Sequence, residues 1–497
     1  MRFTPPPDRS AAKISKARGI TTPFNDEFNR TVDYSSTLAP RAQRDGKAHD
    51  YQTRDFASEN AIPWRSKSTS SGLSPENKGD VMFVLPKRPE DSAVTPEQVQ
   101  ELRKLISLGQ IMTRAYGNLY QDAVFNGNLL HALKTPNVVV FPKTVQEIQD
   151  TVKFARKHDI KLTVKNGGHS FAGYCLNYGG ILINMKNFGA EGITFDLNST
   201  SKTVTIPGGC RWRDVYKCFK DKGHNEMVLG GRCDSVGVSG FTMGGGVSPF
   251  SRPYGLGIDS IISFRIVTAD GDDITVSHDD TCEKKRNLFW ALRGGGGGNF
   301  GVLVEFTTKI HDLANDDGMV VYEVLTWDFP EGRLQFTEMI DKLNSNNKTA
   351  PENLTIDVLW EEDQGQLIVV YDGSEEDYRK LEDIESLKKF GGKSKFELCK
   401  WWKVAVQEQG WSPDSPAFHH HTSFIFGSEA LKPDVVSTVD QIMEELRGVL
   451  SKHDPNGKAY LIWVQVGGKT LKPGAKDTAF YWRDASYVSY FKLQWKN

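Results

Sequence analysis

Lys165-Asn166-Gly167-Gly168-His169-Ser170 is the first of two short stretches that decide how this chain folds, and Gly230-Gly231-Arg232-Cys233-Asp234-Ser235-Val236-Gly237 is the second. The residues before the first stretch, 161–164, have high β propensity and predict a strand that runs directly into the glycines. Because glycine lacks a Cβ, such a turn lets consecutive backbone N–H groups approach a large, flat ligand. Each turn also presents one nucleophilic side chain, the imidazole of His169 or the thiol of Cys233.

Both turns belong to a set of motifs that occur in a fixed order between about residues 135 and 313. The set comprises residues 142–148, 166–174, 233–237, 254–259, and 293–294 continuing to 300–302. On these motifs the chain resembles the FAD-binding domain of the vanillyl-alcohol oxidase (PCMH-type) family. Within that family it is most similar to the berberine-bridge-enzyme-like branch, which includes oligosaccharide oxidases and many fungal biosynthetic oxidases.

The resemblance implies that FAD is the cofactor and that it is held by two covalent bonds. In the family, the histidine binds the 8α-methyl of the flavin and the cysteine binds C6, which gives those roles to His169 and Cys233. Many relatives have proline directly after this cysteine, where this chain has Asp234. Taken alone, the two residues also fit a capped loop histidine and a buried thiol. The remaining residues predicted to contact FAD are Asn166, Gly167, Gly168, Ser170, Tyr174, Gly231, Ser235, Val236, Gly237, Gly240, Asn299, Gly301 and Val302.

The implied activity is that of an oxidase acting on a small organic substrate, a sugar, an alcohol or a secondary metabolite. A hydride moves to flavin N5, a base removes the proton from the neighbouring O–H or N–H, and dioxygen is reduced to hydrogen peroxide. The alternative is a flavin-binding protein of the same fold without oxidase activity, acting as a partner, isomerase or cyclase scaffold. The resemblance also places Val236 at an oxygen gate, a position where valine accompanies oxidases. The alternative is that Val236 only packs behind the loop.

The general base is not assigned by the sequence. The position of a catalytic glutamate in some relatives falls on Val488, which cannot accept a proton. Tyr490 lies on the same face of the predicted strand and is the remaining candidate, although a packed tyrosine is the alternative. The chain also ends at Asn497, before the segment that often supplies a catalytic tyrosine in relatives. We therefore expect the family's C-terminal segment to be missing.

Composition excludes several other classes of protein. A net charge of −2 and a pI near 6.6 give no sign of binding to nucleic acid or to an anionic membrane. No run of the sequence approaches the ~18 apolar residues of a membrane span. The N-terminus lacks the apolar core of a secretory signal, and this favours an intracellular protein over a secreted one. Six cysteines without paired short spacing form neither a zinc site nor a disulfide framework. Residues 419–421, three histidines, alternate across a strand, so no metal site is predicted.

The pattern of elements predicts an α+β protein with two folded domains. Residues 1–93 are rich in Pro, Ser and charged residues and predict a disordered, low-complexity extension. The resemblance implies that residues 94–313 form the PCMH-type FAD-binding domain, which has two subdomains in the family. It also implies that residues 314–497 form a substrate-binding domain, an antiparallel sheet with helices behind it. Its predicted strands cover 320–327, 354–360 and 366–371, and its predicted helices 378–389 and 435–450. Substrate identity and oligomeric state are not set by the sequence.

Overall fold

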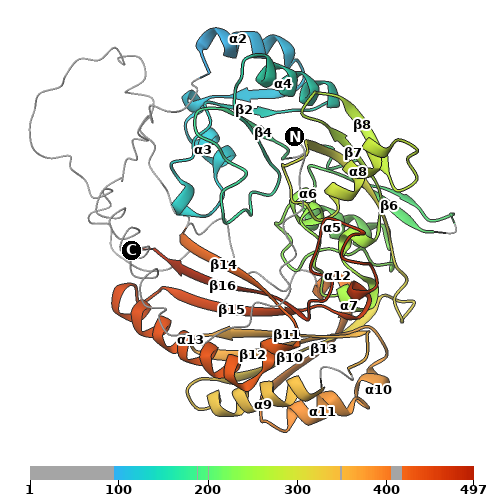
Figure 1. Cartoon of the computed structure of the whole chain (residues 1–497), viewed down its shortest axis with the longest axis vertical. Helices are drawn as coiled ribbons and strands as arrows, with labels where there is room; N and C mark the ends of the chain where they lie inside the picture. Colours follow the sequence, from blue (N-terminus) through green and yellow to red (C-terminus); the bar gives the residue numbers. More distant parts are fainter. Residues whose placement is uncertain (1–93, 187, 200, 347–349, 405–416, 497) are drawn as a thin grey trace, which may run out of the picture. The chain divides into compact units, whose positions relative to one another are not determined.

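The computed structural model describes residues 94–496 with gaps at 187, 200, 347–349 and 405–416, and the predicted extension 1–93 lies outside the described residues (Figure 1). The described chain is a mixture of helices and sheets, as predicted. Two sheets are built from residues before 310 and the third from residues after 318. The boundary between 313 and 314 falls in the connection between them and stays a prediction.

The first sheet has four strands in the order β1-β2-β4-β3, with β2, β4 and β3 parallel and β1 antiparallel. Helices α2 and α4 begin at capping threonines, since Thr95 and Thr144 each accept a hydrogen bond from the backbone N–H three residues later. The bounds are β1 (Gln110–Met112), β2 (Val138–Phe141), β3 (Leu162–Lys165), β4 (Ile181–Asn184), α2 (Pro96–Leu105), α3 (Asn118–Val124), α4 (Val145–Lys157), η1 (Arg114–Tyr116) and η2 (Leu129–His131).

The second sheet has five antiparallel strands in the order β5-β6-β9-β7-β8. The sheet contains two hairpins: β5 pairs with β6, and β7 pairs with β8 around Gly271, whose φ of 79° suits a tight turn. The bounds are β5 (Thr194–Asp196), β6 (Thr203–Pro207), β7 (Ile261–Val267), β8 (Asp273–Ser277), β9 (Val302–Lys309), α5 (Trp212–Lys222), α6 (Val238–Met243), α7 (Ser251–Tyr254), α8 (Glu283–Leu292) and η3 (Gly257–Asp259).

The third sheet has seven strands in the order β13-β10-β12-β11-β15-β16-β14, and every pair is antiparallel. Helices α9 (Arg333–Asn346), α11 (Glu382–Lys388) and α13 (Pro433–His453) gather on one face of it (Figure 1), as predicted, whereas Trp401 of the short α12 packs in the core that contains Trp212. The bounds are β10 (Met319–Asp328), β11 (Leu354–Glu361), β12 (Gln364–Tyr371), β13 (Lys393–Lys400), β14 (Phe418–Phe426), β15 (Lys458–Gln465), β16 (Tyr487–Trp495), α9 (Arg333–Asn346), α10 (Glu375–Tyr378), α11 (Glu382–Lys388), α12 (Trp401–Val404), α13 (Pro433–His453), η4 (Ser428–Leu431) and η5 (Gly468–Leu471). The helix predicted over 378–389 starts later, at Glu382, because Tyr378 closes the short α10.

Alternation along these strands separates two environments. Val358 and Trp360 of β11 lie in the apolar core under the helices, whereas Leu359 and Glu361 face the opposite side. Trp463 of β15 lies in the same core as Trp360. The helix-covered face therefore stabilises the sheet, and the other face is available for chemistry.

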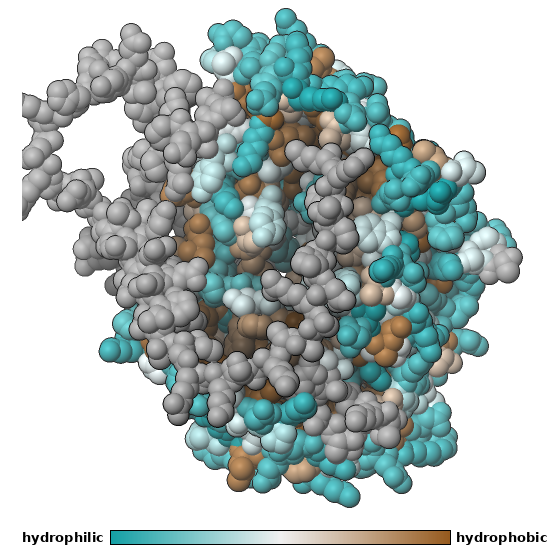
Figure 2. Space-filling model, in the orientation of Figure 1, coloured by the Kyte–Doolittle hydropathy of each residue, from teal (hydrophilic) through white to brown (hydrophobic). Residues whose placement is uncertain are grey.

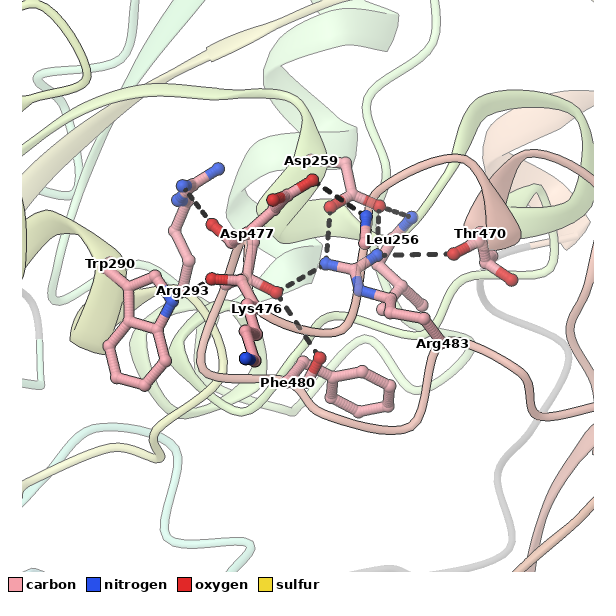
Figure 3. Close-up of polar contacts among 11 residues, drawn as sticks. Leu256, Asp259, Trp290, Arg293, Thr470, Lys476, Asp477, Phe480 and Arg483 are labelled. Carbon is pink, nitrogen blue, oxygen red and sulfur yellow. Dashed lines mark hydrogen bonds and ion pairs between the residues drawn. The ribbon is translucent and has the colours of Figure 1, made fainter. Parts of the chain in front are cut away.

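The fastening segment, residues 467–485 between β15 and β16, joins this third sheet to the part of the chain before residue 310. Figure 3 shows its central contact, in which the guanidinium of Arg483 donates to both carboxylate oxygens of Asp259, each at 2.8 Å. Arg483 also donates to the hydroxyl of Thr478 at 2.6 Å. The side chain of Arg483 is 4% exposed and that of Asp259 is 13% exposed, so the pair is nearly dry.

The Arg483–Asp259 pair gives a prediction about stability. Replacing Arg483 by Met leaves the carboxylate of Asp259 buried without its cation, which lowers the free energy of unfolding by about 3 kcal/mol. Urea denaturation measures the change. The matched control is Lys380→Met, which removes a pair with Glu376 at 64% and 80% exposure and is worth less than about 0.5 kcal/mol. Equal losses for the two variants would contradict the structural role of Arg483.

Candidate functional site

A cavity of about 1160 Å³ lies between the glycine turns and the uncovered face of the third sheet. One wall comes from the two turns and the glycine run after α8, and the other comes from strands β10, β11, β12, β15 and β16. The predicted site residues that line it are Asn166, Gly167, Gly168, His169, Ser170, Tyr174, Cys233, Val236, Gly237, Gly240, Asn299, Gly301 and Tyr490. The structure thus gathers residues from both predicted domains around one space.

Three predicted contact residues do not line this cavity. The carbonyl of Gly231 accepts a hydrogen bond from the buried hydroxyl of Tyr216 at 2.7 Å, which turns it toward the core. Val302 is 1% exposed and packs in the interior at the start of β9. Ser235 is 6% exposed and lies behind His169 and Cys233. The sequence could not distinguish lining residues from the layer that supports them.

The two glycine turns lie directly against each other. A Cβ added at Gly167 would overlap the backbone nitrogen of Gly237, and one added at Gly237 would overlap the side-chain amide of Asn166. The amide oxygen of Asn166 accepts from the N–H of Ser239 at 3.3 Å, while its Nδ2 is buried with no hydrogen-bond partner among the described residues. The two turns can approach this closely only because residues 167 and 237 are glycines. The Nδ2 group of Asn166 remains available to donate a hydrogen bond to a ligand.

His169 and Cys233 meet at a single hydroxyl. Ser235 Oγ lies 2.9 Å from His169 Nε2 and 3.2 Å from Cys233 Sγ. Burial lowers the pKa of His169 to about 3, and the nearby positive charge of Arg211 acts in the same direction. The imidazole is therefore neutral at physiological pH, with a lone pair on one of its two nitrogens.

The glycine run 294–298 has a defined backbone conformation. Gly294, Gly296 and Gly298 have φ values of 112°, 92° and 78°, a region that residues with side chains rarely adopt. A Cβ at Gly294 would approach Phe480 within 2.6 Å. The indole of Trp290 and the guanidinium of Arg293 donate to backbone carbonyls of the same 467–485 segment, each at 2.7 Å (Figure 3). The fastening segment thus holds the run in place.

The sheet wall presents a row of polar side chains that the sequence analysis did not select. Glu361, Tyr460 and Lys492 line the cavity and are direct cross-strand neighbours, since Tyr460 pairs with Glu361 on one side and with Lys492 on the other. Burial raises the pKa of Glu361 and lowers that of Lys492 to about 8. The sequence alone did not select these residues, because their neighbourhood depends on the register in which β11, β15 and β16 pair.

Lys492 and His421 connect the sheet wall to the loop after His169. The ammonium of Lys492 lies over the rings of Phe171 and Tyr460, with centroids at 5.2 and 5.5 Å. The ring of His421 stacks on Phe171 at 4.9 Å and on Tyr490 at 4.7 Å. Tyr490 is therefore packed in the wall and also faces the cavity.

Asn128 makes a second connection at the same place. Its side chain donates to the carbonyls of Phe171 and His419 at 2.9 and 3.0 Å, and it accepts from the N–H of His419 at 3.0 Å.

The described residues contain no group of three or more His, Cys, Asp or Glu arranged to hold a metal. Among the three histidines of β14, His419 and His421 instead have pKa values lowered by burial, to about 3 and about 4.

Comparison with known proteins agrees with this geometry. Residues 136–277 match the family described as FAD binding domain. The Physcomitrella patens BBE-like 1 structure superposes with a TM-score of 0.67 at 20% identity, covering 80% of this chain and 84% of that one. The chain carries an FAD-binding domain and has the fold of the berberine-bridge-enzyme-like oxidases. The resemblance predicted from the motifs is confirmed at this level.

Two further comparisons extend over most of the chain. The Acremonium strictum glucooligosaccharide oxidase, a structure described as containing 6-S-cysteinyl, 8α-N1-histidyl FAD, has a TM-score of 0.62 at 22% identity, covering 75% of this chain and 77% of its own. The uncharacterized FAD-linked oxidoreductase YgaK of Bacillus subtilis is 26% identical over 78% of this chain and 81% of its own length. The first curated relatives, at 34% to 36% identity, are FAD-linked oxidoreductases of which this chain spans only 29% to 39%.

The residues present fit FAD by their own geometry. A glycine-lined cradle, the unpartnered amide of Asn166 and two neighbouring nucleophiles face one cavity. A Cβ at Gly240 or Gly298 would meet nothing within 4 Å, so open space adjoins the backbone there. Within the part of the chain that the structure describes, no helix is both long and apolar enough to cross a membrane.

Proposed function

We propose that this protein is an FAD-linked oxidase that removes a hydride from a small organic substrate and passes the electrons to dioxygen, giving hydrogen peroxide. The observation that carries the proposal is the meeting of His169 and Cys233 at Ser235, beside a cavity with a glycine-lined wall and a polar wall. The likeness to oxidases of the same fold supports it. FAD supplies the hydride acceptor, N5, when it is bound.

We propose that FAD is attached through both His169 and Cys233. The two side chains lie at one end of the glycine-lined wall, and a neutral imidazole is the form that attacks carbon. The bicovalent flavin described for the Acremonium strictum protein makes the same pair of attachments plausible chemistry for this fold.

The two walls of the cavity then have different tasks. The glycine turns and residues 296–298 would bring backbone against a bound flavin, and Asn299 and Gly301 of the same wall would help to hold it. The sheet wall, with Glu361, Tyr460 and Lys492, orients the substrate and excludes water from the reacting carbon. The mixture of carboxylate, phenol and ammonium suits a substrate that carries hydroxyl or amine groups.

For the proton, we assign the base to Tyr490. It lines the cavity on the same strand face as Lys492, two residues away, and its ring is fixed by the stacked His421.

For oxygen, we propose that Val236 shapes the entry beside the flavin. It lines the cavity and packs against the core of the FAD-binding half. An added methylene there fills space that a diatomic molecule needs, because tightly packed interiors contain few voids of that size.

A bleach-and-recover experiment tests the function. Purified protein is screened for peroxide release with sugars, alcohols, phenols and alkaloid-like amines. A substrate found in this way must bleach the visible flavin band without oxygen, and air must restore it. Bleaching that dioxygen does not reverse would contradict oxidase activity. A flavin band that no substrate bleaches, with no peroxide, would favour a flavin-binding scaffold without oxidase chemistry.

Two variants separate the half-reactions and serve as controls for each other. Tyr490→Phe removes the proton acceptor, so anaerobic flavin reduction slows by about 100-fold or more, while reoxidation by oxygen stays unchanged. Val236→Ile slows reoxidation and leaves reduction nearly unchanged. Stopped-flow absorbance measures both rates. Unchanged reduction in Tyr490→Phe removes Tyr490 as the base, and equal changes in both rates for Val236→Ile remove Val236 from the oxygen path.

A further inference from the structure

Ser235 touches both nucleophiles from behind, away from the cavity. Its Oγ lies 2.9 Å from His169 Nε2 and 3.2 Å from Cys233 Sγ, both within hydrogen-bond reach. At 6% exposure the hydroxyl is almost closed to bulk water. It is not one of the residues that line the cavity, so its polar contacts are to the two nucleophiles and not to that space.

One hydroxyl carries one hydrogen, which restricts how it serves two neighbours. It can donate to His169 Nε2 and accept from the thiol, or it can accept from Nε2–H and donate to the sulfur. Because the imidazole is neutral, the choice fixes its tautomer. In the first arrangement the hydrogen of His169 sits on Nδ1. In the second it sits on Nε2, and Nδ1 carries the lone pair.

We propose that Ser235 is the positioning residue that prepares both His169 and Cys233 for covalent attachment to FAD, by accepting from Nε2–H and donating to Sγ. This inference rests on the proposed function, in which FAD is held by both residues. Accepting from Nε2–H makes Nδ1 the nucleophilic nitrogen of His169. The same orientation directs the hydroxyl hydrogen at the sulfur, where it stabilises the negative charge of a thiolate.

Lys492 of the sheet wall interacts electrostatically with Cys233. Lys492 lines the same cavity, and the charge of Cys233 raises the pKa of that ammonium, against the larger lowering by burial. Arg232, the residue before the cysteine, forms a buried ion pair with Asp357 of β11. The charge of Arg232 is therefore already balanced by Asp357, whereas Lys492 brings a cation from the sheet wall to the cavity that Cys233 lines.

The bonds and electrons balance without a further reagent. The bond from Cys233 Sγ to C6 replaces the S–H and C6–H bonds, and the bond from His169 Nδ1 to the 8α carbon replaces an N–H and a C–H bond. Each attachment therefore releases two protons and two electrons. The electrons pass through the flavin to dioxygen, which leaves as hydrogen peroxide, the same acceptor as in the proposed reaction.

The test counts the two bonds in the purified full-length protein by peptide mass spectrometry, with total FAD per chain measured alongside. Wild type carries FAD bonded to the peptides of both residues. In Ser235→Ala we expect FAD to remain bound. The fraction of FAD bonded to Cys233 falls at least about tenfold, because the sulfur loses a charge-assisted hydrogen bond. The histidyl fraction falls as well, because Nε2 no longer has the partner that fixes its tautomer.

A matched pair controls for shape. Ser235→Thr keeps the hydroxyl and must retain both bonds, whereas Ser235→Val has nearly the same shape without it and must lose them as alanine does. Both bonds at wild-type levels in the valine or alanine variant would overturn the proposal. Loss of both bonds in the threonine variant, or loss of all FAD from the alanine variant with its fold intact, would also overturn it. A wild type without either bond would instead refute the bicovalent flavin of the proposed function.

Discussion

The contact between Gly167 and Gly237 is the constraint on which the rest of the site depends. Neither residue has room for a Cβ, because each would overlap the turn that carries the other. Backbone contact at this point brings the imidazole of His169 and the thiol of Cys233 to one hydroxyl, although the two residues are far apart in sequence. The cavity, its nucleophiles and its orphaned amide on Asn166 all follow from that approach.

The second half of the chain completes the site through a sheet whose two faces differ. Its helix-covered face buries large apolar side chains such as Trp360 and Trp463, which stabilises the sheet. The other face places Glu361, Tyr460 and Lys492 over the glycine turns. Since the fastening segment 467–485 belongs to this half and accepts hydrogen bonds from Trp290 and Arg293, next to the run 294–298, the two walls of the cavity are not independent of each other.

The sequence predicted much of this, and the limits have physical reasons. Strand-to-turn patterns and motif order are local features of the sequence. The glycine turns, the hairpins and the mixed fold could therefore be predicted from it. Tyr490 was accessible too, because alternation places it on one face with Val488. The polar row was not, because sheet order β11-β15-β16 and its register arise from tertiary pairing. Ser235 was predicted as an FAD contact, but its place between His169 and Cys233 is set only when the two turns meet. The clash that a Cβ at Gly294 would make with Phe480 likewise depends on tertiary packing.

The central claim is that the two turns hold one FAD by two bonds, and covalent attachment in the denatured protein tests it most directly. Acid-precipitated wild type stays yellow after washing. The single variants His169→Ala and Cys233→Ala each keep flavin attached through the remaining residue, and the double variant loses it. Flavin that washes completely out of denatured wild type would contradict the account, whatever the native protein binds.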